Sequence, residues 1–501
     1  MRSRTRIIAS AVILLVIIFG YLSWKAIETP GTLLKGAGQT FQLDETFQLA
    51  ETFQLDETFK TQLAELPEAV QEWVQRPILP YDNSVALNNK TCPTEGVNFD
   101  EGAVKENEGA WRHITPSKIS DWRQDIAEYL YRKQKEKQEK MSPETPLAKD
   151  EQGKEFLGGR GLVMAAGDHA AVVRARTNIR LLRSYNCTLP VEIFHFPNEL
   201  SSPEKSLLEE LSSLKQHSED QEDQSGMPVT VRVVEGVRKG GDWKAFHIKA
   251  AAIQQSSFDE ILYLDTDSYT LRNPEYLFES MQWKETGLML WPDYTKSHAT
   301  NPIWRLSGQI CRNEYEGESG QILISRTLHQ DLLWLAEFFA LEHHKFYGFL
   351  GGDRDSFRAA ALLMGKKWTG PGRLNAAAGV VLADNPQGGG HTMLQADPEG
   401  KWLFVHANLI KHAKFRRPLW SRIHRATQDK FAAESTYGDI HPPNDKLGDG
   451  VKLRVTYEPM MSTVMSTFEG YDEGLVVVED WDTYEELKGF EEKWFGFGGV
   501  H

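Results

Sequence analysis

Two aspartates separated by a single residue stand at the end of an apolar run. Asp265 and Asp267 follow Ile261–Leu264, a segment with the pattern of a buried β-strand. Carboxylate oxygens suit hard divalent cations, and a strand end that opens into a loop leaves room for further ligands. A cation held there could bridge the two phosphates of a nucleotide sugar and stabilise the departing diphosphate. The spacing therefore predicts a metal site suited to nucleotide-sugar chemistry.

The same spacing occurs at two other places in the chain, and a chain of this composition supplies roughly one or two such triplets by chance. Asp480 and Asp482 also follow an apolar run, but Asp482 and Glu485 have the spacing of a helix capping box, which favours a structural role. Asp353 and Asp355 precede an expected short helix, where one of them could serve as an N-cap. A cap alone does not require both.

The elements around Asp265 follow the pattern of an α/β domain. Short apolar runs alternate with helical stretches, which predicts a largely parallel sheet covered by helices. In such sheets ligands bind outside the carboxyl ends of the strands, where Asp265 is expected to stand. The expected strands are 162–165, 191–196, 229–234 and 261–264, and the expected helices are 169–184, 206–217 and 244–256.

The N-terminus carries an apolar run, Ile7–Trp24, that is long enough to span a bilayer. Three arginines precede it and Lys25 follows, which predicts a cytosolic N-terminus. A cleaved signal peptide is the alternative, but its apolar region would be shorter and would end in small residues. We therefore expect a type II, single-pass membrane protein with a luminal remainder.

A luminal location affects how the cysteines and sequons are interpreted. Cys92, Cys187 and Cys311 allow one disulfide and one leftover thiol, and buried free thiols are an equal alternative, so no pair is assigned. Asn89 and Asn186 begin possible glycosylation sequons. The net charge of −15 argues against nucleic acid as a partner.

The chain is expected to fall into six consecutive parts. A six-residue repeat over 41–58 fits no helical period and indicates a low-complexity spacer, while the charged stretch near 132–140 indicates a solvated helix. The predicted parts are a cytosolic tail (1–6), the anchor (7–24), a luminal stem with the repeat (25–110), a charged helical segment (111–157), a catalytic domain (158–425) and a C-terminal region that completes or flanks it (426–501).

A set of short motifs runs in order through the expected catalytic domain. They are Ile179–Arg183, Leu189–Ile193, Lys249–Ile253, Tyr263–Asp267, Asn273–Pro274, Leu290–Asp293, Glu318–Gln321 and Gly352–Arg358. Together they resemble the fungal Golgi α-1,2-mannosyltransferases that build mannan branches, glycosyltransferase family 71, over the segment from Arg160 to about Lys411. The resemblance implies a GT-A nucleotide-diphospho-sugar transferase fold with a Rossmann-like, mostly parallel sheet.

The same resemblance implies the substrates and most of the site. It implies GDP-mannose as donor, Mn²⁺ as metal, retention of the α configuration and mannan or protein glycans as acceptors, with a Golgi mannosyltransferase complex as a possible assembly. Asp265 and Asp267 would bind the metal with His406 as third ligand. Lys249 would contact the donor diphosphate or nucleotide, and Lys411 would contact the diphosphate. Asp265 would bind the donor through the metal.

For the remaining candidate residues, and for the function itself, alternative roles stay open. Arg180 lies on a helical face with other arginines and could touch donor phosphates or form a structural ion pair. Asp353, Asp355 and Glu318 are the candidate catalytic carboxylates for acceptor orientation or acid/base work, and the retaining route stays open. A UDP-sugar transferase of the same fold and a catalytically silent sugar-binding partner in a Golgi complex remain the alternative functions.

Overall fold

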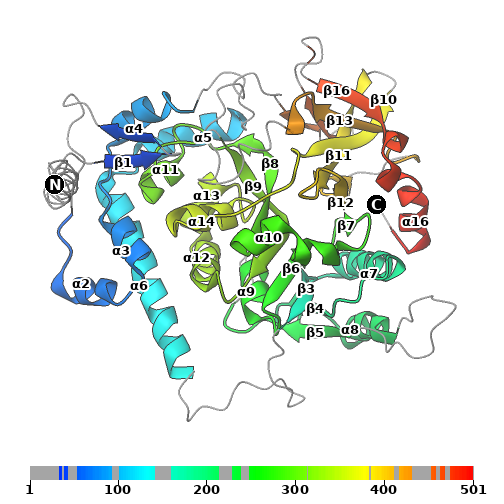
Figure 1. The fold of residues 1–501 in the computed structure, drawn as a ribbon, viewed down its shortest axis with the longest axis horizontal. Helices are drawn as coiled ribbons and strands as arrows, with labels where there is room; N and C mark the ends of the chain where they lie inside the picture. Colours follow the sequence, from blue (N-terminus) through cyan, green and yellow to red (C-terminus); the bar gives the residue numbers. More distant parts are fainter. Residues whose placement is uncertain are drawn as a thin grey trace, which may run out of the picture.

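A six-stranded mixed sheet lies at the centre of the chain (Figure 1). The computed structural model describes residues 33–36, 39–42, 53–92, 101–140, 159–213, 228–237, 248–312, 314–382, 385–410, 417–430, 453–458, 463–468, 474 and 476–499. The sheet has the order β5-β4-β3-β6-β9-β8. Its strands are β3 (Arg160–Ala165), β4 (Val191–His195), β5 (Val229–Val233), β6 (Glu260–Leu264), β8 (Leu288–Lys296) and β9 (Tyr315–Ser325).

The α/β class is confirmed, and the sheet is mixed, with β9 running opposite to the other five strands. Strands β5, β4, β3 and β6 are parallel, whereas β9 runs antiparallel to both β6 and β8. The parallel half was predictable because helices separate its apolar runs. Strand β9 is buried along its whole length, yet it contains Glu316, Glu318 and Gln321. Because these residues are polar, the hydrophobic pattern does not predict most of this strand.

Helices cover both faces of this sheet. Helices α7 (His169–Ser184) and α8 (Ser202–Glu209) share one apolar core with Leu162 and Met164 of β3. On the other face, Val163 joins a core with helices α9 (Ile248–Gln255), α12 (Gln330–Leu341) and α14 (Ser356–Leu363). Successive strand residues point to opposite faces, so one strand supplies both cores.

The N-terminal helices extend the second of these cores. They are α2 (Glu57–Ala64), α3 (Glu68–Gln75), α4 (Tyr81–Asn88), α5 (Glu101–Arg112) and α6 (Pro116–Lys140). Trp73 and Ile119 are fully buried in the core that contains α12 and α14. Figure 1 shows α6 alongside α12. The buried guanidinium of Arg123 donates to the backbone carbonyls of Arg305 and Leu306.

These contacts differ from the luminal stem expected over 25–110, whereas the charged stretch of α6 over 132–139 is half-buried to exposed, as a solvated helix would be. From residue 53 onward, the described part of that stem packs into the domain. In α6, Ile119, Trp122, Ile126 and Leu130 form a buried stripe at helical spacing. The charged residues around this stripe dominated the sequence pattern. A disulfide joins Cys92 to Cys311, while Cys187 is a buried free thiol.

A second sheet of eight strands, antiparallel throughout, contacts the first through the loop after β6. Its strands are β7 (Ser268–Thr270), β10 (Ala376–Leu382), β11 (Asn385–Ala396), β12 (Trp402–His406), β13 (Arg422–Ala426), β14 (Leu453–Glu458), β15 (Thr463–Phe468) and β16 (Val476–Asp480). The described residues after 426 therefore complete this sheet. Helix α16 (Phe490–Gly496) then packs against α7, at the right of Figure 1.

The capping box expected at Asp482 is wrong. Asp482 is exposed within the 3₁₀ turn η5 (Trp481–Thr483), and η6 (Glu485–Leu487) follows without a side-chain cap. The remaining elements are β1 (Leu33–Gly36), β2 (Gln39–Gln42), η1 (Glu210–Ser213), η2 (Pro274–Glu279), α10 (Met281–Thr286), α11 (Pro302–Ser307) and α13 (His343–Leu350). In the described part of the chain no helix has the length and apolar character to cross a membrane. The expected anchor, 7–24, lies outside the described residues.

Candidate functional site

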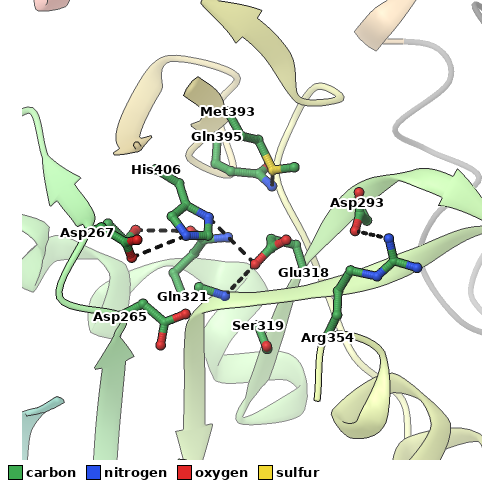
Figure 2. Close-up of polar contacts among 12 residues, drawn as sticks. Asp265, Asp267, Asp293, Glu318, Ser319, Gln321, Arg354, Met393, Gln395 and His406 are labelled. Atoms are coloured by element: carbon green, nitrogen blue, oxygen red, sulfur yellow. Dashed lines mark hydrogen bonds and ion pairs between the residues drawn. The ribbon is translucent and has the colours of Figure 1, made fainter. Parts of the chain in front are cut away.

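Asp265, Asp267 and His406 come together where the two sheets meet (Figure 2). Asp265 directly follows β6, and β7 begins just after Asp267. Strand β12 pairs with β7 so that His406 lies opposite Ser268, and the amide of Ala407 donates to the carbonyl of Asp267 at 2.9 Å. One ligand atom from each side chain of the triad lies within 4.8 Å of the others. The pairing of two short strands thus joins residues distant in sequence.

The position of this triad also follows from the topology of the first sheet. The chain runs from β3 outward through β4 to β5 and then returns to place β6 on the other side of β3. Ligands in open α/β sheets bind at the carboxyl ends of the strands where the order reverses in this way. Asp265 stands at that end of β6, so topology and side-chain chemistry point to the same place.

The triad is largely withdrawn from solvent. The side chains of Asp267 and His406 are 6% and 7% exposed, whereas that of Asp265 is 29% exposed. Burial alone would lower the pKa of His406, but the carboxylates of Asp267, Glu318 and Asp265 outweigh it and raise the pKa above its ordinary value. The site therefore attracts positive charge, and Asp265 provides its accessible side.

The donor set fits a divalent transition-metal cation. Two carboxylates and one imidazole give a mixed oxygen and nitrogen set, which suits Mn²⁺ and similar ions. The imidazole Nε2 lies 3.5 Å from Oδ1 of Asp267, too far for a strong hydrogen bond. Asp265, Asp267 and His406 would hold the ion.

Lys249 lies beside the triad and is buried. Its ammonium contacts Asp353 at 2.8 Å, Asp265 at 3.1 Å, and both the carbonyl and the hydroxyl of Ser319 at 2.8 Å. Burial lowers the pKa of Lys249, but the two carboxylates outweigh it and raise the pKa. An ammonium has three donors, and these contacts use them. Lys249 therefore links the two carboxylates to each other and to β9, and its expected contact with the donor diphosphate or nucleotide stays a prediction.

The candidate catalytic carboxylates separate into two groups. Asp353 is 14% exposed and shares Lys249 with Asp265. Asp355 is 1% exposed, with both oxygens bound by Arg358 at 2.7 Å and one also accepting from the amide of Gly317. Burial raises the pKa of Asp355 to about 6 despite Arg358. Asp355 thus forms a buried, structural ion pair with Arg358. Its side chain does not cap α14.

The cationic residues also differ from expectation. Arg180 donates to the carbonyl of Phe497 at 3.2 Å, so it holds the C-terminal segment and not the triad. The arginine that lies near the triad is Arg174. Its Nε donates to the hydroxyl of Thr266, the residue between the two aspartates, at 3.3 Å. Sequence reasoning missed it because Arg176, Arg180 and Arg183 suggested a different face of α7. Lys411 lies outside the described residues.

A usable signal for Arg174 was its spacing to Asn178. The two lie four residues apart, on one face of α7. Asn178 is fully buried and donates to the carbonyl of Ser268 at 2.7 Å. Helix α7 also carries buried apolar residues, so two polar residues on one of its faces indicate that this face packs against polar groups. Those groups are Thr266 and Ser268, in and after the loop that follows β6.

Comparison with known proteins points to mannosyltransferases over part of the chain. Residues 159–306 match the family described as "Mannosyltransferase putative". The chain is 28% identical over 243 residues to alpha-1,2-mannosyltransferase MNN21 of Candida albicans, covering 38% of this chain and 36% of the relative. It is 24% identical over 267 residues to MNN2 of the same organism, covering 44% and 43%. It is 26% identical over 157 residues to MNN5 of Saccharomyces cerevisiae, covering 30% and 24%.

These matches confirm the resemblance to fungal mannosyltransferases and support the class of glycosyltransferase. The matched segment spans less than half of each of these relatives. Among solved structures, the chain is similar to the glycosyltransferase GlyE of Streptococcus pneumoniae (TM-score 0.27, 15% identity, 42% of this chain and 45% of that one). It is also similar to the galactosyltransferase LgtC (TM-score 0.30, 12% identity, 40% and 70%). At these scores neither structure bears on function.

Proposed function

We propose that this chain, whose residues 159–306 match a mannosyltransferase family, transfers mannose from GDP-mannose to α-mannoside acceptors of mannan or protein glycans. The observation that carries the proposal is the triad of Asp265, Asp267 and His406 at the carboxyl end of β6. An acidic, partly open metal site is what a nucleotide diphosphate sugar requires. When bound there, Mn²⁺ supplies Lewis-acid stabilisation of the departing diphosphate.

The residues around the triad have separate roles in this proposal. Arg174 meets the donor diphosphate, because a guanidinium binds phosphate oxygens in pairs. Within the described residues it forms no ion pair with a carboxylate, so its charge is available to a ligand. Asp353, fixed by Lys249 and Ser319, is the carboxylate placed to orient an acceptor hydroxyl.

The finer features of the reaction are supported by the relatives. Those reported above are named alpha-1,2-mannosyltransferases, which supports a mannose donor and the α-1,2 linkage. GDP-mannose as donor, retention of configuration and a GT-A fold rest on the motif resemblance and are part of the proposal. The parallel half of the sheet with Asp265 at its edge is compatible with that fold.

The proposed location is the Golgi membrane, with a type II topology and a luminal catalytic domain, alone or within a mannosyltransferase complex. The apolar run Ile7–Trp24 supports the anchor. The disulfide between Cys92 and Cys311 supports an oxidising compartment, because such bonds persist in the secretory pathway.

The test compares donors on the purified full-length chain in detergent with α-mannobiose and Mn²⁺. We expect transfer from GDP-mannose at a rate well above that from any UDP-sugar. Linkage analysis of the product should give an α-1,2 bond. Preferential use of a UDP-sugar would contradict the named donor, and donor hydrolysis without transfer would contradict the acceptor class.

A further inference from the structure

The imidazole of His406 has one nitrogen toward the triad and one toward a second carboxylate. Nε2 lies 3.5 Å from Asp267, whereas Nδ1 lies 3.6 Å from Oε1 of Glu318 (Figure 2). Nδ1 is buried and forms no hydrogen bond. A buried polar atom without a partner is costly, so the nearest acceptor is significant. Glu318 is the closest carboxylate on this side of the ring.

Strand β9 holds Glu318 and the ring in fixed relation. Oε1 of Glu318 accepts from the amide of Gly320 at 2.7 Å. Gly320 lies directly beneath the imidazole, since a Cβ there would stand 2.5 Å from Cε1 and 2.6 Å from Nδ1 of His406. The carbonyl of Gly320 in turn accepts from the amide of Asp265 at 2.9 Å. The segment from Glu318 to Gly320 thus contacts both His406 and Asp265.

Among the described residues, Glu318 lies closer to His406 than to any lysine or arginine. In the described residues no lysine or arginine forms an ion pair with Glu318. The nearby guanidinium of Arg354 binds Asp293 at 2.7 Å and Glu316 at 2.5 Å instead. Glu318 is about a tenth exposed, so solvent does little to neutralise it. Among the described residues, the donor group nearest to this carboxylate on a basic side chain is therefore Nδ1 of His406.

A neutral imidazole that binds a metal uses one nitrogen and carries its proton on the other. We infer that Glu318 is a positioning residue that keeps the proton of His406 on Nδ1, so that Nε2 is free to bind the cation beside Asp267. This role rests on the proposed metal site and differs from the acid/base role expected from the sequence. It requires Nδ1 and Oε1 to approach by a few tenths of an ångström once the ion is held.

The test measures Mn²⁺ affinity directly, by electron paramagnetic resonance of free Mn²⁺ during titration of the full-length chain without nucleotide. Glu318→Ala removes the acceptor and should weaken binding by about 10- to 100-fold, the usual cost of losing such a partner. Glu318→Gln keeps an acceptor oxygen and should recover most of the affinity. Glu318→Met keeps the volume without an acceptor and should behave as Glu318→Ala, which decides the matter if the alanine variant does not fold.

Two further variants separate this inference from the proposed function. Glu192→Gln is the matched control, because Glu192 is a buried carboxylate of the same sheet paired with Arg232, and it should bind Mn²⁺ as the wild type does. Asp267→Ala should abolish binding. Wild-type affinity in Glu318→Met and Glu318→Ala would overturn the positioning role and leave the metal site intact. Wild-type affinity in Asp267→Ala would overturn both.

Discussion

Nε2 of His406 lies 3.5 Å from a carboxylate oxygen of Asp267, although the two residues are distant in sequence: Asp267 directly precedes β7, and His406 ends β12 of the same sheet. The register of β12 against β7 creates this relationship, with His406 opposite Ser268. Asp265 follows β6 of the other sheet, so the candidate metal site depends on the pairing of β7 with β12 and on the junction of the two sheets, not on the Asp-x-Asp triplet alone.

Gly320→Ala should impair the site without unfolding the protein. The new methyl group would stand 2.5 Å from the ring of His406, so the imidazole or the strand must shift and the geometry of the triad changes. We expect the rate of mannosyl transfer to fall at least about tenfold, since small displacements of catalytic groups are costly. Initial rates at saturating donor, with thermal unfolding of the same samples, check this.

Gly348→Ala is the matched control for that variant. Gly348 lies in α13, and a Cβ there would meet no atom within 4 Å. Replacing an exposed helical glycine by alanine stabilises a helix by up to about 1 kcal/mol. Transfer should be unchanged. An equal loss of activity in both variants would show that the effect is not steric contact with His406.

Arg174→Gln should weaken donor binding more than Arg180→Gln. Arg174 adjoins Thr266 between the two aspartates, whereas Arg180 binds the carbonyl of Phe497. Loss of a charge-assisted phosphate contact costs about 1.5–3 kcal/mol, or roughly 10- to 100-fold in affinity. Calorimetric titration with GDP and Mn²⁺ measures this. A larger loss in Arg180→Gln would reverse our assignment.

Lys296 should make stability depend on pH. Burial lowers its pKa from 10.5 to about 7, so the folded chain releases this proton near pH 7 while the unfolded chain keeps it to about pH 10. The unfolded state binds more protons in that window, so the free energy of unfolding rises with pH, by at most about 1.4 kcal/mol per unit from this group.

The measurement is urea unfolding of the wild type and Lys296→Met between pH 7 and 9. The variant lacks the titrating group, so its stability should rise less steeply with pH. Parallel pH profiles for the two proteins would mean that Lys296 stays protonated in the folded chain.

Cys311→Ser should destabilise the whole domain. The disulfide to Cys92 ties the N-terminal helices to the segment before β9 across 219 residues of sequence. Loss of a native disulfide costs about 2–5 kcal/mol. Chemical unfolding with and without reductant checks this, because reductant should bring the wild type to the stability of the variant. A wild type insensitive to full reduction would contradict the prediction.

The parallel half of the first sheet was predictable because period and length distinguish its apolar runs from the helices between them. The place of Asp265 followed from the strand before it, and the choice of His406 came from family resemblance. What no local pattern reveals is pairing between distant strands, such as β12 with β7. Contacts of that kind are set by tertiary packing.

Charge type alone did not predict the contacts of three residues. Asp355 and Lys249 form ion pairs away from solvent, and Arg180 donates to the carbonyl of Phe497, contacts that only the fold creates. The buried stripe of α6 was masked by its charged neighbours. Sequence reasoning identifies which groups could do chemistry, whereas burial decides which of them are free to do it.

The most direct measurement is the Mn²⁺ dependence of mannosyl transfer from GDP-mannose to α-mannobiose by the wild type and by Asp267→Asn. This substitution keeps the shape of the side chain and removes its charge. Our account predicts that chelation stops the wild type, that Mn²⁺ restores it, and that the variant is inactive at any Mn²⁺ concentration. Transfer by the wild type that persists in chelator, or Mn²⁺-dependent transfer by the variant at the wild-type rate, would contradict it.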